Sequence, residues 1–297
     1  MENKELPQDL AEQRQIIMGD AFYLPGISNN DYHASSGVSS SVIRKFGRSQ
    51  LHALREEVEQ TPALRFGSAA HSYIVEGENV FNNEVACISG SPYTNANKQL
   101  RADYEARGLT VITVEERDRI IDMSNSLIPE GHKMLNPDEG EYPGAFESPY
   151  EQAIYWYEKG LLLKVKSDVI RKPMSHPHAS NSVVLIDYKT TTDCSPKGFT
   201  NSIYKFDYHL QAAWYKRAYE RAGYKVEGFA FVAQEKKLPY ASKIFWISNA
   251  DMDKGWVYLD RLITEYKSVV NGVDPTIYNT PHQVNIDIVW RKENEWR

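Results

Sequence analysis

The stretch of sequence that decides the fold spans residues 185–190 and reads Leu185-Ile186-Asp187-Tyr188-Lys189-Thr190. Four apolar residues, 183–186, come directly before the acid, and such a run is typical of a central strand buried on both faces. Side chains alternate along a strand, so Asp187 and Lys189 share one face, and we expect both to be partly exposed at the end of the sheet. The triplet is either a strand-end ion pair or part of a reactive site.

A second acid stands on the preceding predicted strand, residues 161–170, where apolar and charged residues alternate. Asp168 falls on the same face of this strand as Lys164 and Lys166. If the two strands pair antiparallel across the loop 171–182, the carboxylates of Asp168 and Asp187 converge at one end of the sheet. Two carboxylates suit a hard cation such as Mg²⁺, which can bind a phosphate oxygen and lower the pKa of a bound water. The neighbouring lysine could orient or deprotonate that water.

Polar residues outside these strands could complete such a site. Tyr208, Gln211 and Tyr215 form one stripe on a predicted helix, 204–222, although a half-buried core stripe explains them equally. His71 lies on a predicted helix, 63–75, and imidazole is a common metal ligand, yet a lone helical histidine is often a core or surface residue. Glu151 begins a predicted strand, 151–157, and could add a carboxylate or be a solvated strand end.

The rest of the chain alternates helices with short strands, which predicts one α/β domain with a central mixed sheet flanked by α-helices. Thr113 and Glu116 form a capping box that starts a further helix. The remaining predicted helices are 39–58, 95–107 and 250–270, and the remaining predicted strands are 85–88, 228–233 and 242–247. We expect residues 1–20 to form a polar N-terminal arm and residues 21–297 to form the single domain.

Composition narrows the class of protein. Of the 297 residues 41% are hydrophobic and 25% are charged, as in ordinary packed domains, which excludes collagen-like and wholly disordered chains. No run of apolar residues is long enough for a membrane helix, and the first residues lack the apolar core of a signal peptide, so we expect a cytoplasmic protein without membrane contact. Two cysteines exclude a zinc site built from paired cysteines.

Taken together, the motifs resemble the PD-(D/E)XK nuclease superfamily, and within it the exonuclease VIII (RecE) type of phage recombination exonucleases. The likeness covers about residues 27–260, and Ser167 stands where the superfamily name has proline. Its motifs, in chain order, are the stretches 26–33 and 37–39, the histidine helix 61–71, Asp168 with 186–191, the helix 208–215, and 231–236 with Pro239-Tyr240. The resemblance implies a restriction-endonuclease-like core.

The resemblance also implies an activity and a set of roles. It implies a magnesium-dependent 5′–3′ exodeoxyribonuclease, with Mn²⁺ as a substitute, that degrades one strand of linear double-stranded DNA from its ends and leaves a 3′ single strand for recombination. It further implies a RecT-type single-strand annealing protein as partner, and a homo-oligomeric ring. The implied metal ligands are His71, Asp168, Asp187 and the carbonyl of Tyr188. The implied catalytic groups are Asp168, Asp187, Lys189 and Gln211, with Glu151, Arg65, Tyr208 and Tyr215 as DNA-binding or auxiliary residues.

Two alternatives remain at this point. The same core serves PD-(D/E)XK endonucleases, and a chain with a decayed site could be a non-catalytic DNA-binding or assembly protein. The formal net charge of −6 argues mildly against a protein coated in nucleic acid. DNA binding therefore requires bases to gather near the site, and the candidates are Lys164, Lys166, Arg171, Lys172, Lys197 and Lys205.

Overall fold

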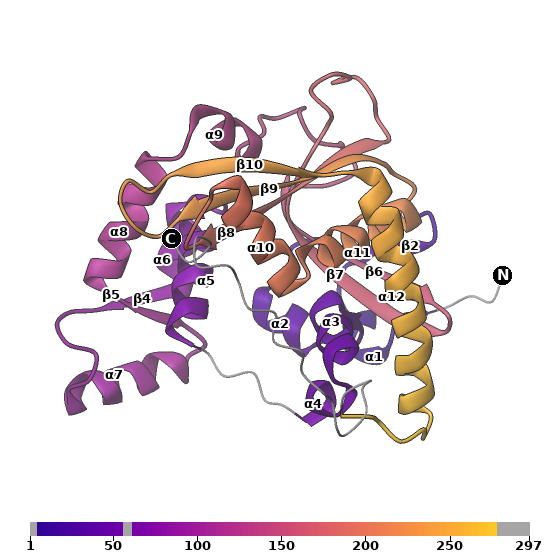
Figure 1. Cartoon of the computed structure of the whole chain (residues 1–297), viewed down its shortest axis with the longest axis horizontal. Coiled ribbons are helices and arrows are strands. Elements are labelled where there is room, and N and C mark those ends of the chain that lie inside the picture. The colour runs from indigo at the N-terminus through magenta and orange to yellow at the C-terminus, as the bar shows by residue number, and fades with distance from the viewer. Residues whose placement is uncertain (1–4, 56–60, 278–297) are drawn as a thin grey trace, which may run out of the picture.

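A mixed β-sheet forms the centre of the computed structural model, which describes residues 5–55 and 61–277 (Figure 1). Within this part of the chain the sheet has the strand order β1-β2-β6-β7-β8-β9-β10, and β3 pairs with β7. Its strands are β1 (Ile16–Met18), β2 (Ala21–Leu24), β3 (Val38–Ser39), β6 (Tyr150–Glu158), β7 (Leu161–Arg171), β8 (Ser182–Thr191), β9 (Lys225–Glu235) and β10 (Ser242–Ile247). The pairs β3–β7 and β8–β9 are parallel and the others antiparallel, so the predicted mixed sheet is confirmed.

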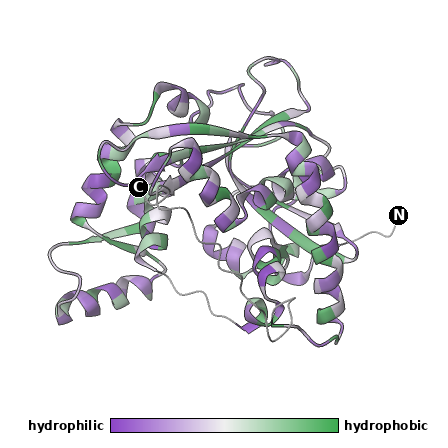
Figure 2. Cartoon of the chain, viewed as in Figure 1, coloured by the Kyte–Doolittle hydropathy of each residue, from purple (hydrophilic) through white to green (hydrophobic). Residues whose placement is uncertain are grey.

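Helices cover both faces of this sheet (Figure 1). One face packs against α3 (Ser40–Arg48), α10 (Pro196–Phe206), α11 (Tyr208–Arg221) and α12 (Asn249–Val270) through a core that includes Trp214 and Phe231. The other face packs against α5 (Pro62–Ile74), α8 (Val114–Asn125) and α9 (Pro129–Leu135), with Tyr188 and Val232 in that second core. Figure 2 shows hydrophobic residues along the strands and hydrophilic residues over much of the helices.

Smaller elements complete the domain. The strands β4 (Val85–Ile88) and β5 (Thr110–Thr113) form a separate two-stranded parallel sheet. The remaining helices are α1 (Gln8–Ala11), α2 (Asn29–Ala34), α4 (Gln50–Arg55), α6 (Glu78–Glu84) and α7 (Asn95–Glu105). No helix in the described part of the chain has the length and apolar character needed to span a membrane.

Several local predictions are confirmed. The bounds of β4 and β10 are those expected from the sequence, and the other predicted strands are displaced by only a few residues at their ends. Thr113 and Glu116 form the predicted capping box at the start of α8. The Thr113 hydroxyl accepts a hydrogen bond from the Glu116 N–H at 3.2 Å, and the Thr113 N–H donates to Glu116 Oε2 at 2.9 Å.

Two predicted helices are wrong because each is divided. The helix expected over 204–222 is α11 preceded by a separate α10, and the two meet at Asp207, whose backbone is left-handed at φ 53° and ψ 40°. The helix expected over 39–58 is broken at Ser49, which is extended at φ −161° and ψ 113°. A single residue outside the helical region ends a helix without changing the hydrophobic pattern, so periodicity alone did not find either break.

The first twenty residues contain structure that the sequence did not predict. Among those described, α1 and β1 lie within the expected polar arm, and β1 pairs with β2 at the edge of the main sheet. Leu6 and Leu10 are buried in a small core against Leu24 and Tyr155. These leucines stand four residues apart in a polar stretch, too short a pattern to distinguish a weak helix from a loose arm.

The pairing of β7 with β8 ends abruptly, and this opens the sheet. The antiparallel register runs from Arg171 opposite Val184 to Val169 opposite Ile186 and stops there. Strand β8 nevertheless continues to Thr191, paired in parallel with β9. Asp168 and Asp187, the next residues on the two strands, therefore lie where the strands diverge, and their side chains face a gap in the ladder.

Candidate metal centre

The two predicted carboxylates stand on the divergent strands β7 and β8, close enough for Asp168 to act electrostatically on Asp187. Asp168 Oδ2 accepts a hydrogen bond from the Tyr188 N–H at 3.0 Å, which replaces a ladder bond that β7 no longer provides. Asp187 forms an ion pair with Lys189 and accepts a hydrogen bond from Gln211 Nε2 at 2.5 Å. The expectation that both members of the triplet are partly exposed is wrong for Asp187: its side chain is 0% exposed, because α11 covers it, whereas that of Lys189 is 21% exposed.

His71 reaches the same place from α5. Its Nε2 atom lies 3.1 Å from Asp168 Oδ2 and 3.6 Å from Glu151 Oε1, and its Nδ1 atom lies 3.3 Å from Glu76 Oε1. Glu76 was not predicted. It follows the end of α5 by two residues, and Gly77, with φ 93°, turns the chain there. No helical spacing links residues 71 and 76, so a pattern search along the helix passes over this acid.

Glu151 is aimed at the site by an irregularity in the sheet. The β6–β7 register pairs Tyr150 with Val169 and Gln152 with Ser167, but leaves Glu151 and Asp168 unpaired between them. Glu151 has a left-handed backbone, φ 55°, a conformation that costs about 1–3 kcal/mol and is concentrated at functional sites. Its carboxylate also forms a 2.9 Å ion pair with Lys166. Of the two readings that the sequence left open for Glu151, the structure favours the added carboxylate, because the side chain is half-buried in the cluster.

Burial and mutual repulsion disfavour the charged forms of Asp187 and Glu151. Burial raises the pKa of Asp187 to about 6, and the Asp168 carboxylate acts in the same direction. Burial likewise raises the pKa of Glu151 to about 7. Burial also acts to raise the pKa of Asp168, but the His71 imidazole, the Lys189 ammonium and the Tyr188 N–H together outweigh it and hold that pKa below its ordinary value. Carboxylates gathered in this way are stabilised by a bound cation.

The donor set fits a divalent metal ion. His71 Nε2 and Asp187 Oδ2 are buried atoms without a hydrogen bond of acceptable geometry, although each has an ion-pair partner nearby. Ligand atoms of His71, Glu76 and Glu151 all lie within 4.8 Å of one another, and Asp168 joins them through His71. Carboxylate oxygens favour hard cations such as Mg²⁺ and Mn²⁺. When bound, such an ion would polarise a phosphate oxygen and acidify a water molecule.

The α11 stripe lines the Asp187 side of the cluster. Gln211 is buried and its Nε2 atom donates to both Asp187 Oδ1 and, at 3.1 Å, the Tyr215 hydroxyl. The Lys189 ammonium lies 5.3 Å from the centroid of the Tyr208 ring. Burial alone would lower the pKa of Lys189, but Asp187 and Asp168 outweigh it and the pKa is raised, so the side chain is an ammonium.

The other predicted site residues lie farther from the cluster. The Tyr188 side chain points to the opposite face of the sheet, where its hydroxyl donates to Gln234 Oε1 at 2.9 Å, and only its backbone belongs to the carboxylate end. Arg65 is half-buried on α5, nearly two turns before His71. Arg44 on α3 was not predicted. Its half-buried guanidinium is attracted by Tyr215, Asp207 and Asp187, an approach of α3 that no local pattern indicates.

The expected gathering of basic residues is only partly correct. Lys164 is buried and donates to the carbonyls of Tyr32 and Ser35, each at 2.7 Å. Arg171 is buried beneath Glu141, and Lys172 donates to the Gly140 carbonyl at 2.9 Å. These three bases hold the fold together. Of the six candidates, Lys166 contacts the cluster, and Lys205 lies at the end of α10.

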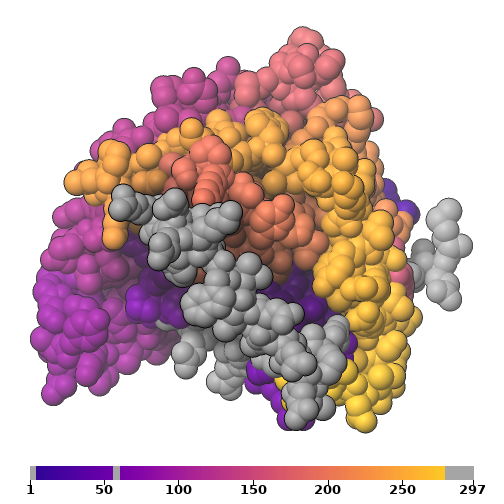
Figure 3. All heavy atoms as spheres, in the orientation of Figure 1, coloured from indigo at the N-terminus to yellow at the C-terminus, as the bar shows by residue number. Residues whose placement is uncertain are grey.

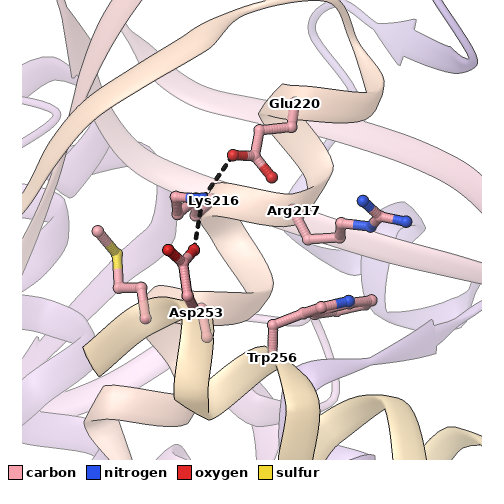
Figure 4. A pocket seen from close by; sticks show the side chains of 7 residues that line it. Lys216, Arg217, Glu220, Asp253 and Trp256 are labelled. Carbon is pink, nitrogen blue, oxygen red and sulfur yellow. Dashed lines mark hydrogen bonds and ion pairs between the residues drawn. The ribbon is translucent and has the colours of Figure 1, made fainter. Parts of the chain in front are cut away.

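Two hollows mark the surface. One of about 340 Å³ adjoins the cluster and is lined by Glu76, Glu151 and Lys166, together with residues of the segment 26–29. The other, about 220 Å³, lies between α11 and α12. Figure 4 shows it lined by Lys216, Asp253 and Trp256, with Lys216 paired to Glu220 and Asp253. The first hollow lies beside the candidate metal centre, whereas the charged groups Lys216, Glu220 and Asp253 that line the second pair with one another.

The strand order, the divergent carboxylates and the lysine two residues on place the chain among known folds. Residues 39–279 match the family model described as a PDDEXK-like domain of unknown function (DUF3799). The chain belongs to this family. Its membership confirms the PD-(D/E)XK superfamily predicted from the motifs, whereas the exonuclease VIII type stays a prediction.

A solved structure supports the same fold for this PDDEXK-like domain. The crystal structure of a "putative exonuclease" from Eubacterium rectale is similar with a TM-score of 0.58 and 14% sequence identity, covering 89% of this chain and 96% of that one. At this identity the likeness concerns the fold. No curated protein matches the chain.

Proposed function

We propose that this PDDEXK-like domain is a metal-dependent deoxyribonuclease, specifically a 5′–3′ exonuclease that acts on linear double-stranded DNA and leaves a 3′ single strand. The observation that carries the proposal is the meeting of Asp168, Asp187 and Lys189 at the point where β7 and β8 diverge. The printed name of the Eubacterium rectale protein supports an exonuclease, and the resemblance of the motifs supports the polarity.

The proposed metal ligands are His71, Asp168, Asp187 and the Tyr188 carbonyl, with Glu151 and the newly found Glu76 close enough to assist. Mg²⁺ is the proposed cofactor, since the site is rich in oxygen ligands. Hydrogen bonds on both sides keep the carboxylates in place before any ligand arrives: Tyr188 N–H holds Asp168, and Gln211 holds Asp187. Such preorganisation avoids a reorganisation cost during the reaction.

Lys189 is proposed to orient the attacking water and to balance negative charge that develops on the phosphate. Its ammonium is anchored by Asp187 and rests against Tyr208, so it cannot rotate freely away from the carboxylates. A positioned charge in a partly enclosed site acts more strongly than one in water. Lys166 and Arg65 are proposed to contact the DNA backbone at the edge of the site.

The test compares linear and circular duplexes. The linear duplex carries a different label at each 5′ end, and both substrates are incubated with Mg²⁺ or with EDTA and resolved by strand. We expect progressive loss of 5′ labels from the linear form only, and only with Mg²⁺. Cutting of the closed circle would favour the endonuclease alternative, and DNA binding without cleavage in any metal would favour a non-catalytic DNA-binding protein.

The resemblance alone supports the proposed assembly: a homo-oligomeric ring that holds DNA, and a RecT-type annealing protein that receives the 3′ strand in the cytoplasm. A ring would explain how an acidic chain stays on DNA through many cuts, because enclosure needs no strongly basic surface. Light scattering at assay concentration tests this. A monomer that still degrades DNA processively would contradict the ring.

A further inference from the structure

An aromatic path leads outward from the lysine of the site. The Lys189 ammonium lies 5.3 Å from the Tyr208 ring centroid, and the Tyr208 and Phe206 centroids are 5.5 Å apart with their planes at 30°. Phe199, fully buried, tilts against the inner side of Tyr208 at 34°. Phe206 is the outermost of these rings and is 43% exposed. The ring planes are thus tilted by 30–34° from one another, and the series ends at solvent.

The backbone beneath Phe206 is held rigidly by α3. The Arg44 guanidinium donates to the Phe206 carbonyl at 2.7 Å. Arg48 donates to the Lys205 carbonyl at 2.6 Å and to Asp207 Oδ2 at 2.6 and 2.8 Å. These bonds fix the left-handed Asp207, and the kink at Asp207 sets how α10 meets α11. An exposed apolar ring on a fixed backbone is suited to ligand binding, because little conformational freedom is lost when a ligand contacts it.

The surroundings of Phe206 are cationic. The Lys205 ammonium lies 5.2 Å from the Phe206 ring centroid, and Arg44 and Arg48 lie beneath it, where Asp207 and Asp187 act on Arg44 and Asp207 pairs with Arg48. An aromatic ring beside cationic side chains complements a nucleotide, whose base is flat and whose phosphate is anionic. Figure 3 shows α10 at the surface, between β10 and α12.

We infer that Phe206 is a stacking platform for an unpaired base of single-stranded DNA whose strand runs on to the carboxylates. The inference rests on the proposed function and specifies how the substrate strand is held. A base stacked on Phe206 extends the ring series that ends at Lys189, and it displaces the Lys205 ammonium toward the neighbouring phosphate. A base inside a duplex is covered on both faces by its neighbours, so the platform selects unpaired bases.

The test measures binding without cleavage. A fluorescein-labelled 12-nucleotide oligo-dT is titrated with the full chain in EDTA, and anisotropy gives Kd for the parent, Phe206→Ala, Phe206→Trp and Tyr93→Ala. Tyr93 is the matched control, since it is 80% exposed in the segment before α7. Stacking contributes about 1–3 kcal/mol per base, so Phe206→Ala should bind roughly 5- to 150-fold more weakly, with Phe206→Trp and Tyr93→Ala near the parent.

A second oligonucleotide series tests whether Phe206 stacks on the base at one position of the strand. Single abasic sites are placed along the oligo-dT, and the parent should lose affinity at one position by the factor that Phe206→Ala shows. The Phe206→Ala variant should lose nothing further at that position. Equal Kd values for the parent and Phe206→Ala, or additive losses at every position, would overturn the inference. Cleavage is scored separately with Mg²⁺, so a parent that binds without cutting contradicts the proposed function and leaves the stacking result standing.

Discussion

The backbone N–H of Tyr188 donates to the Asp168 carboxylate at 3.0 Å, across two strands whose ladder ended one residue earlier. This bond links β7 to β8 beyond the last pair of their ladder. It fixes Asp168 beside the Asp187–Tyr188–Lys189 triplet, so that carboxylates from two strands belong to one site. The site is therefore a consequence of how the sheet splits, and the following predictions test its parts.

Lys189→Ala is expected to separate chemistry from binding. The substitution removes no proposed metal ligand, so metal and DNA should bind as in the parent, while single-turnover cleavage falls by roughly 10²–10⁴-fold, the usual loss for a positioned proton-transfer or charge-stabilising group. Lys216→Ala is the matched control: its side chain is 15% exposed and ion-paired, and it lies in the hollow of Figure 4. Parental cleavage by Lys189→Ala would remove Lys189 from the mechanism.

His71→Ala and Glu76→Gln are expected to weaken metal binding while the fold stays intact. Loss of such groups commonly reduces metal affinity or activity by about 10–100-fold, and His71→Ala should have the larger effect because its imidazole lies between Asp168, Glu151 and Glu76. Calorimetric titration with Mn²⁺ measures the affinity, with the exposed His176→Ala as control. If His71→Ala binds Mn²⁺ like the parent, His71 is a core residue only.

Acid should weaken the fold through Glu158. Burial acts to raise the pKa of this carboxyl, but hydrogen bonds from Arg221 and Arg217 outweigh it and hold the pKa below the ordinary value of 4.5. A lowered pKa in the folded state stabilises the fold above pH 4.5, and this contribution is lost as pH falls below that value.

Urea unfolding from pH 7 to pH 3 measures the effect of Glu158. Glu158→Gln should be less stable than the parent at pH 7, and the difference should shrink at low pH. Glu265→Gln, from a surface pair with Arg261, should change little at any pH. A constant difference between Glu158→Gln and the parent would show that the ionisation of Glu158 does not contribute.

The strand that carries the site should depend on a buried hydrogen bond on its other face. Tyr188 donates to Gln234 Oε1, and Gln234 Nε2 donates to the carbonyls of Met123 and Tyr240 at 2.7 and 3.2 Å. Tyr188→Phe leaves the Gln234 oxygen unpaired and should cost about 1–3 kcal/mol of unfolding free energy. Urea unfolding of Tyr188→Phe beside the exposed Tyr93→Phe checks this, and equal stability of the two would contradict it.

The sequence was most informative where one residue pattern has one structural meaning. Alternation and apolar runs located β7, β8 and β10, and the Thr113 capping box located α8, because these patterns act locally. The antiparallel turn from β7 to β8 then placed Asp168 near Asp187 without knowledge of the rest of the chain.

What sequence reasoning missed depends on tertiary contacts or on single backbone angles. The left-handed Asp207 divides a helix, and the left-handed Glu151 orients a carboxylate toward the site. Aspartate adopts this conformation more often than most residues do, but too rarely to predict it at one position, and glutamate gives no signal for it. Glu76 and Arg44 enter the site from turns and helices far away in the chain. The burial of Asp187 follows from the packing of α11 over β8, which the strand pattern alone does not contain.

Magnesium titration of Asp187→Asn beside the parent tests the central claim most directly. The substrate is a 5′-labelled linear duplex, the readout is single-turnover cleavage, and each protein is also titrated with Mn²⁺ by calorimetry. Asn keeps the size of Asp and removes the charge that a divalent cation requires, so binding and cleavage should both be lost. Asn can still accept the hydrogen bond from Gln211, and burial and Asp168 disfavour the charge while Lys189 favours it, so the urea stability in EDTA should change little. Full metal affinity and cleavage in Asp187→Asn would contradict the account, and the triplet would then be an ordinary strand-end ion pair.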